Sequence, residues 1–272
     1  MAARAILRRV ALWLGGAVFG LAGIVVAALL LLQTAPAKTW LAATVSDLAS
    51  DASGMAVSIG RIEGVVPTDF TLAHLRIADA EGAWLDAEDL ALDWRAAALL
   101  GGRVEIDRLS ARHVTIHRAP AAGTPEPPEE EAAPFRLEIP SLPVELALRD
   151  LSISEIRLGA GLIGRDVTAA IFGSAEIGGR PQDAALDLDL VRLDGPPGRA
   201  TLQLALERPD GALTLAASVE EPAGGIIARL LDLPDLPPVS LQLDGTGPAA
   251  GWRGRLDARA GAAEAGLDLR LA

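Results

Sequence analysis

The sequence contains no cysteine among its 272 residues. Disulfide bonds, a thiol nucleophile and a cysteine-ligated zinc site are therefore excluded. Aromatic residues are also scarce, at 3% of the chain, and after residue 134 only Phe135, Phe172 and Trp252 occur. Large aromatic side chains usually fill compact cores, so this half of the chain has few of the residues that a closed core would use.

Basic residues are outnumbered, with 24 Lys and Arg against 36 Asp and Glu, for a net charge of -12. Residues 1–32 contain three arginines and no acid, so residues 33–272 carry 21 basic and 36 acidic residues, a net of -15. No basic stripe interrupts this excess, so a surface that binds the phosphates of nucleic acid is excluded. The excess negative charge promotes solubility.

One long stretch, the 23 residues from Val10 to Leu32, has no charged residue at all. As a helix it would be about 34 Å long, enough to cross the roughly 30 Å hydrocarbon core of a bilayer. Three arginines precede it and only Lys38 follows closely. This asymmetry predicts a cytoplasmic N-terminus. We therefore expect residues 1–37 to form a short cytoplasmic segment and a single-pass anchor in the inner membrane, with the remaining residues in the periplasm.

A cleaved secretory signal is the alternative interpretation of this segment. Ala35, Pro36 and Ala37 resemble a small-x-small cleavage site. Signal peptides, however, have apolar regions of about 7 to 15 residues, and a proline inside the cleavage tripeptide argues against processing. The anchor is therefore the preferred prediction, and in either case the body of the protein is exported.

Behind the anchor the sequence divides into three parts. Leu41, Val45, Leu48 and Ala52 recur at helical spacing, which predicts a short amphipathic helix over residues 38–52. The pattern then becomes typical of β-strands, so we expect a first β unit over residues 38–118 that includes the helix. Residues 119–134 contain five prolines and four glutamates and can bury almost nothing, so an exposed linker is expected there. Residues 135–272 form the second β unit.

Leucine alternation gives the clearest strand signal, and it is found in the second unit. Leu186, Leu188 and Leu190, for example, alternate with Asp187 and Asp189. A period of two places the leucines on one face of a sheet and the polar residues on the other. Glycine and proline clusters between the runs predict hairpin turns, and residues 225–231 have a helical pattern. The candidates for one shared apolar face are Leu188, Leu202, Leu204, Leu206, Leu213, Leu215, Leu241 and Leu243.

An apolar face of this kind must be covered or closed. A closed β-sandwich would bury the leucines in a core, whereas an open sheet would offer them as a groove to another apolar body. The scarcity of aromatics favours the open sheet. The sequence also stops in mid-strand at Leu269-Arg270-Leu271-Ala272, and we expect it to be the beginning of a longer protein.

An ordered set of short motifs in the first unit resembles a known family. The set begins with Ile62-Glu63-Gly64-Val65-Val66-Pro67-Thr68-Asp69-Phe70-Thr71-Leu72 and continues with Leu75–Asp79, Gly82–Leu85, Leu90–Trp94, Leu99–Ile106, Leu109 and Val114–Ile116. This succession is similar to the N-terminal region of the TamB family, the inner-membrane subunits of translocation and assembly modules. More broadly, it resembles the AsmA-like bridge proteins.

The resemblance implies a mostly β fold in which an elongated, taco-like antiparallel sheet with an apolar trough follows a transmembrane helix. It implies a bridge protein, not an enzyme, that aids outer-membrane protein (autotransporter-type) assembly and secretion and the passage of phospholipid. Its partners would be the inner membrane, phospholipid and an outer-membrane barrel. The family's C-terminal region, which engages that barrel, has no counterpart in these residues. The alternative is a periplasmic structural or adaptor β-sandwich without lipid cargo.

The sequence offers little to an enzyme, and we expect no catalytic, cofactor-binding or metal-binding residues. Gly159–Gly164 is a literal GxGxxG, but no adequate helix follows to hold a pyrophosphate, so an inter-strand turn is expected. His113 and His117 would lie about 13 Å apart on one strand, too far for one metal ion. Asp187 and Asp189 match alternation on a solvated face rather than acid–base catalysis.

Overall fold

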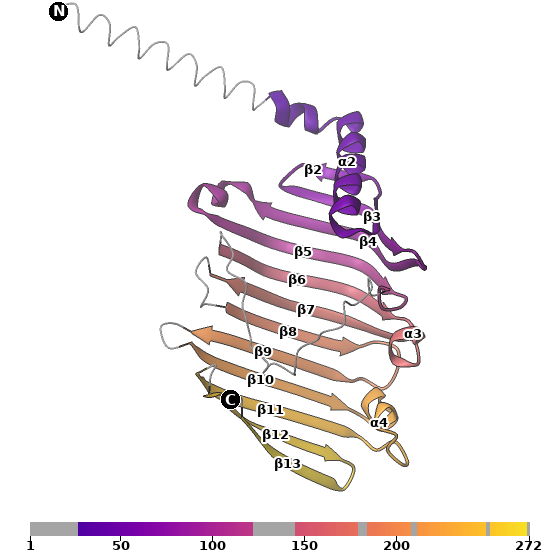
Figure 1. Ribbon diagram of the computed structural model, residues 1–272, viewed down its shortest axis with the longest axis vertical. Helices are drawn as coiled ribbons and strands as arrows, with labels where there is room; N and C mark the ends of the chain where they lie inside the picture. The colour runs from indigo at the N-terminus through magenta and orange to yellow at the C-terminus, as the bar shows by residue number, and fades with distance from the viewer. Residues whose placement is uncertain (1–26, 122–144, 179–183, 208–210, 249–250, 271–272) are drawn as a thin grey trace, which may run out of the picture.

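The computed structural model describes residues 27–121, 145–178, 184–207, 211–248 and 251–270. One β-sheet of 13 strands forms the body of the described protein (Figure 1). The helical segments are α2 (Ala35–Ser53), the 3-10 helix η1 (Ala96–Gly101), α3 (Ala160–Ile163) and α4 (Ile226–Leu230). The strands are β1 (Ala56–Ile59), β2 (Ile62–Val65), β3 (Asp69–Asp79), β4 (Gly82–Arg95), β5 (Arg103–Ile116), β6 (Glu145–Leu158), β7 (Val167–Ile177), β8 (Ala184–Arg192), β9 (Arg199–Glu207), β10 (Ala212–Glu221), β11 (Val239–Pro248), β12 (Arg253–Ala260) and β13 (Ala263–Arg270).

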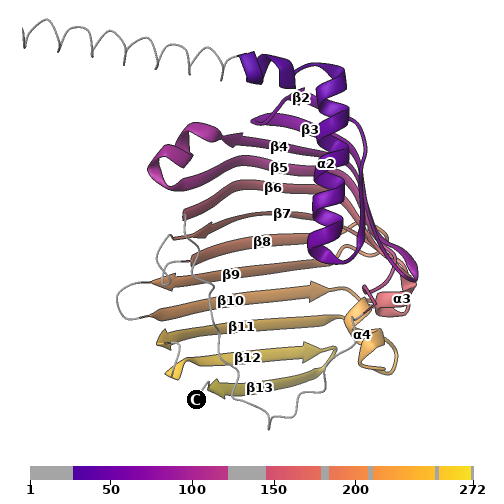
Figure 2. The ribbon, with the colours of Figure 1, turned by 45° about the horizontal axis from the view of Figure 1, so that its top comes forward.

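The strands follow one another across the sheet in chain order, from β1 and β3 to β13, with β2 beside β3. Within the described residues β1 and β13 do not pair with each other, so the sheet is open (Figure 2). The prediction of a mostly β protein with an open sheet is therefore confirmed, and the alternative of a closed sandwich is wrong.

One pair of strands corrects the expectation of an antiparallel sheet. β5 and β6 are parallel, with Arg103 opposite Glu145 and Ile116 opposite Leu158, whereas all other neighbours in the described sheet are antiparallel. Parallel neighbours need a long connection because the chain must return along the whole strand before pairing again. The segment between β5 and β6, residues 117–144, supplies this length. The expected linker at 119–134 lies, from residue 122 on, outside the described residues.

Helix α2 confirms the predicted helix over residues 38–52. Pro36 stands in its first turn, where a missing N–H costs no hydrogen bond. The helix ends at Gly54, whose φ of 67° suits a glycine and whose N–H donates to the carbonyl oxygen of Ser50. Ala42 packs with Ile62 and Leu72, so the helix lies against the sheet at its β1–β3 end.

Of the predicted apolar stripe of α2, only Leu41 packs against the sheet. The backbone N–H groups of Val57 and Ile59 instead donate to Ser50 Oγ (2.9 Å) and Ser46 Oγ (3.0 Å) on the neighbouring face of the helix. Val45 and Leu48 are 40% and 68% exposed. Small side chains allow close approach of helix and strand, which explains why they form the contact.

The expected membrane anchor, residues 10–32, lies mostly outside the described residues. None of the helices in the described part combines the length and apolarity that crossing a bilayer requires. The predicted short helix at residues 225–231 is confirmed as α4.

Candidate functional site

The candidate site is the sheet face that carries the leucines, which we call the apolar face. Residues that are directly paired in neighbouring strands lie on the same face of a sheet, so the pairing registers trace this face from strand to strand. One row crosses ten strands, from β4 to β13, without a charged residue. It comprises Trp94, Ile106, Leu148, Ala175, Leu186, Leu204, Leu215, Gly245, Gly254 and Leu269. At about 4.8 Å between strands, such a row is roughly 43 Å long.

The registers place all eight predicted leucines on the apolar face, in four adjacent rows. Leu204 pairs with Leu215 within the ten-strand row. Leu206 pairs with Leu213 in a second row beside it. Leu188 pairs with Leu202 in a third row, which also contains Leu243. Leu241 lies in a fourth, opposite Val219. The structure thus brings the predicted residues together as one surface.

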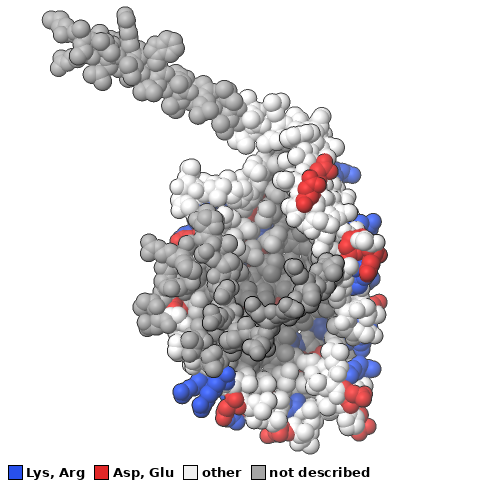
Figure 3. Space-filling model, viewed as in Figure 1, with Lys and Arg blue, Asp and Glu red and all other residues white. Residues whose placement is uncertain are grey.

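This surface is only partly covered in the described structure. Leu213 is buried, at 4% exposure, but the other seven leucines are half-buried. No large side chain among the described residues is completely buried, and the one hydrophobic cluster with a helix over it is that of α2. In Figure 3, drawn from the side on which α2 lies, the charged side chains that can be seen gather mainly around the outline. A partly covered apolar face of this length is suited to binding an extended apolar ligand.

Trp252, which the sequence analysis did not single out as a site residue, covers the end of the face on β11 and β12. A Cβ atom on Gly245 or Gly254 would lie 1.9 or 2.3 Å from its indole ring, so the two glycines leave the space in which the indole lies. The indole is 4% exposed, and its Nε1 has no hydrogen-bond partner in the described structure. The pair of facing glycines is the sequence signal that could have identified this aromatic cover.

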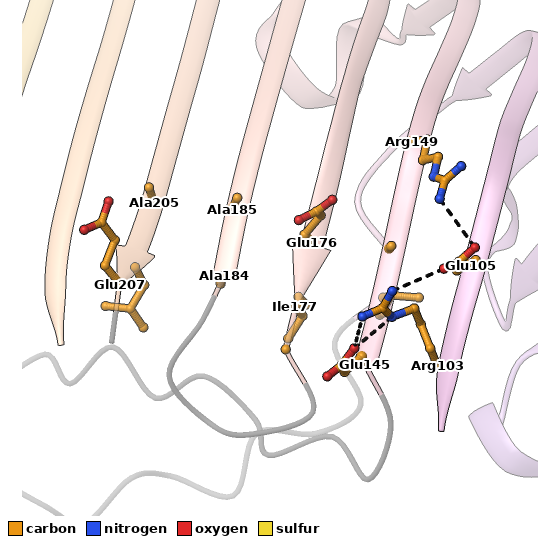
Figure 4. Close-up of a pocket in the computed structure, with 14 residues that line it drawn as sticks. Arg103, Glu105, Glu145, Arg149, Glu176, Ile177, Ala184, Ala185, Ala205 and Glu207 are labelled. Carbon is orange, nitrogen blue, oxygen red and sulfur yellow. Dashed lines mark hydrogen bonds and ion pairs between the residues drawn. The ribbon is translucent and has the colours of Figure 1, made fainter. Parts of the chain in front are cut away.

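The opposite face is charged and is strongly ion-paired along β4, β5 and β6. Glu105, with a side chain only 14% exposed, accepts from Arg95 (3.2 Å), Arg103 (3.3 Å) and Arg149 (3.4 Å). Arg103 also reaches Glu145, at 2.6 Å, and so connects the parallel strands (Figure 4). These bridges explain how the polar face holds β5 and β6 together without a hairpin.

A hollow of about 670 Å³ lies on this polar face near the strand ends of β5 to β9 (Figure 4). Four glutamates line it, but only two arginines do, so its walls are predominantly acidic. The charged lining residues are Arg103, Glu105, Glu145, Arg149, Glu176 and Glu207. Arg103, Glu105, Glu145 and Arg149 already form ion pairs along β5 and β6, and we assign no ligand to the hollow.

The histidines bind carboxylates on the polar face. His117 lies 3.0 Å and His74 3.3 Å from Asp86, which also accepts from Arg76 at 2.7 Å. Burial alone would raise the pKa of Asp86, but the hydrogen bonds from Arg76 and His117 bring this pKa below its usual value. The described residues contain no group of three or more side chains placed to hold a metal ion.

A second carboxylate fixes the chain where it leaves β5. Arg118 donates to both oxygens of Asp79, and the N–H of Ala121 donates to Asp79 Oδ2 at 2.7 Å. The hydrogen bond from the Arg118 guanidinium, followed by that from Ala121, holds the pKa of Asp79 far below its usual range. These hydrogen bonds hold Arg118 and Ala121 against the end of β3 and have a structural role.

The GxGxxG of Gly159–Gly164 connects β6 to β7 and contains only the four-residue helix α3. So short a helix offers no extended N-terminal site for a pyrophosphate, which agrees with the expected inter-strand turn.

The fold and this face define a class: open single-layer β scaffolds with one continuous apolar face. The family model described as the TamB N-terminal domain matches residues 24–172, more than half of the chain, so the protein belongs to this family. The match confirms the resemblance inferred from the motifs of the first β unit. No curated protein matches the chain, and no solved structure matches it.

Proposed function

We propose that this protein is an inner-membrane-anchored bridge in the periplasm that carries phospholipid along its apolar face. The observation that supports the proposal best is the unbroken apolar row over ten strands, together with the half-buried leucines on either side of it. Each methylene of an acyl chain that leaves water contributes about 0.8 kcal/mol. A face of this kind can therefore hold acyl chains along its length without recognising any one position.

Family membership extends the proposal to outer-membrane biogenesis. The TamB-type proteins that this sequence resembles are bridge proteins that work with an outer-membrane barrel in protein assembly and secretion. In this proposal the sheet supplies the lipid path, and no binding site for the barrel partner is assigned to these residues. No catalytic residue, cofactor or metal takes part.

The decisive test is photo-crosslinking from adjacent positions of β9 in intact cells. Leu204 lies on the apolar face, whereas its neighbour Gln203 pairs with Asp187 and Ala216 on the polar face. A photoreactive amino acid in place of Leu204 should crosslink phospholipid, and the same amino acid in place of Gln203 should not. The absence of lipid from both positions contradicts the proposal.

A matched pair of substitutions tests the open face directly. Leu204→Arg should leave the protein folded, because the arginine stem can lie along an open apolar face with its charged end in water. Lipid crosslinking from a neighbouring position such as Leu215 should fall. Gln203→Arg is the control and should change neither the folding of the protein nor its crosslinking to lipid. Global unfolding of Leu204→Arg in circular-dichroism melts would indicate a closed core instead, where a buried unpaired charge costs several kcal/mol.

The proposed topology is tested separately. The protein should remain in the membrane pellet after alkaline washing, and residues beyond Lys38 should be cleaved by protease added to spheroplasts. A soluble mature protein that begins at Lys38 would replace the anchor with a cleaved signal.

A further inference from the structure

Arg192 interrupts the apolar face with a positive charge. It pairs with Ala169, which continues a row of Ile156 and Val114, and it follows Leu190 at the strand period of two. Every other Lys or Arg of the described strands has its register on the polar face. Arg192 is nevertheless only 5% exposed. A buried cation on an apolar face is costly unless it is paired.

The pairing of Arg192 is incomplete. Its Nε donates to Asp194 Oδ1 at 2.8 Å, but its Nη1 is buried and has no hydrogen-bond partner in the described structure. Asp194 is shared, since Arg165 lies 3.6 Å from its other oxygen. Burial alone would raise the pKa of Asp194, but the hydrogen bond from Arg192 lowers it below its usual value, so the carboxylate is ionised. One carboxylate thus serves two guanidinium groups.

The surrounding loop is built closely around this side chain. A Cβ atom on Gly195 would lie 2.9 Å from Arg192 Nη2, so a side chain at this position would force the guanidinium to move. Glu221 lies on the other side of Gly198: a Cβ atom on this glycine would lie 3.3 Å from Glu221 Cγ and 3.8 Å from Arg192 Cβ. Its carboxylate is already engaged, because it accepts the N–H of Ile227 at 2.7 Å at the start of α4. Neither Asp194 nor Glu221 forms a hydrogen bond with Arg192 Nη1 in the described structure.

We propose that Arg192 binds the phosphate of an anionic amphiphile whose apolar chain lies along Leu190 and Leu188. The inference rests on the proposed function and adds a headgroup site to it. The guanidinium fork suits a phosphate, and its free Nη1 supplies a charge-assisted hydrogen bond. Leu190 and Leu188 are two and four residues away on the same face, or about 7 and 13 Å, so a chain anchored at Arg192 reaches the predicted leucines directly.

The experiment measures binding to the full chain, reconstituted in phosphatidylcholine nanodiscs, by calorimetry with three soluble probes. Octyl phosphate carries both the chain and the phosphate, octanol carries the chain alone, and inorganic phosphate carries the anion alone. Octyl phosphate should bind about tenfold more tightly than octanol, as a charge-assisted hydrogen bond implies. Inorganic phosphate should bind more weakly than octyl phosphate. Equal affinity for these two would overturn the lipid source of the ligand.

Two variants locate the effect. Arg192→Met should remove the preference for octyl phosphate and leave octanol binding unchanged. Arg199→Met is the matched control, because Arg199 pairs with Asp189 at 2.7 Å on the polar face and is 63% exposed in its side chain. Arg199→Met should keep the preference for octyl phosphate over octanol. If Arg192→Met does not fold, the wild-type chain still decides: octyl phosphate, and not octanol, should shift the Nε resonance of Arg192.

The outcomes separate this inference from the proposed function. Equal binding of octyl phosphate and octanol to the wild type, or a preference that survives in Arg192→Met, overturns the role of Arg192 while leaving an apolar lipid path intact. Failure of octanol to bind, together with the absence of lipid crosslinks from position 204, overturns the path itself.

Discussion

The sheet consists of two regions that build the same apolar face in different ways. In β3 to β6 the strands are 11 to 14 residues long and their pairing is interrupted by register shifts. In β8 to β13 they are 8 to 10 residues long and their pairing is regular. The first region also carries the shared ion pairs around Glu105, whereas the second depends on leucine pairs.

The difference shows how a sheet can keep one apolar face without strict alternation. In β4, Leu85 and Ala87 are followed by Leu90 and Leu92, a spacing of three at Asp89. Asp89 has a φ of 49°, and this change in backbone direction returns the following side chains to the same face while the register with β3 and β5 continues unshifted. The same face is therefore encoded by a period of two in the second region and by interrupted periods in the first.

The largest expected effect comes from shifting one strand by a single residue. One alanine inserted between Gln203 and Leu204 turns the following leucines to the polar face or forces a new bulge. We expect the melting temperature to fall by more than about 10 °C, in line with a loss of several kcal/mol. The matched insertion after Asp89, where β4 is already irregular, should lower it by less than half as much. Equal losses would contradict the comparison between the two regions.

Acid should weaken the first region through Asp79. Its pKa in the folded protein is far below the unfolded value, so the carboxylate contributes stability that is fully present above about pH 4 and is lost as the pH falls further. Asp79→Asn should therefore be less stable than the wild type at pH 7 and should lose less on acidification. Urea unfolding at pH 7 and pH 3 measures the stability of each protein and its loss on acidification. Asp257→Asn, on the exposed face of β12, is the control, and an equal response would contradict the role of Asp79.

The positive φ of Asp89 should make this position sensitive to side-chain shape. A β-branched residue is strained there, so Asp89→Val should lower the free energy of unfolding by about 1–2 kcal/mol. Part of the loss reflects the ion pair with Arg112, at 3.1 Å. Asp187→Val in the regular strand β8 should change it by less than about 0.5 kcal/mol. Chemical denaturation of both variants gives the comparison, which fails if their effects are the same.

The smallest expected effect concerns the ion pairs. Glu105→Gln should cost about 1 kcal/mol, because its carboxylate is mostly buried and is shared by three arginines. The cost should shrink in 1 M salt. Asp257→Asn removes one exposed pair with Arg255 and should cost less than about 0.5 kcal/mol. A salt-independent loss in Glu105→Gln would point to packing rather than charge.

Sequence patterns predicted the fold best in strands where the alternation of apolar and polar residues is uninterrupted. The alternation of Leu202, Leu204 and Leu206 sufficed to place them on one face, because β9 has no bulge. The parallel pairing of β5 with β6 could not be predicted in this way, since it depends on partners more than 40 residues apart. Most of the packing face of α2 was also missed, because apart from Leu41 it is formed by small residues and serine hydroxyl groups.

The headgroup candidate was missed for a different reason. Arg192 continues the period of Leu186, Leu188 and Leu190, which puts it on the apolar face. Its burial and its unpaired Nη1, however, follow from the loop around Gly195 and Gly198, which no local pattern predicts.

The parallel pair also divides the molecule in a way that chemistry can exploit. Most antiparallel neighbours are joined by a turn or a loop between consecutive strands, but β5 and β6 pair across a long connection, through their hydrogen bonds and through ion pairs such as those of Arg103 and Arg149. The chain could therefore be cut between them without removing any hairpin. Residues 38–118 and 145–270, produced as two separate chains, should reassemble along this seam, as in split-protein complementation. Mixing the two chains would then restore the apolar face across the seam, and either chain alone would carry only its own part of this face.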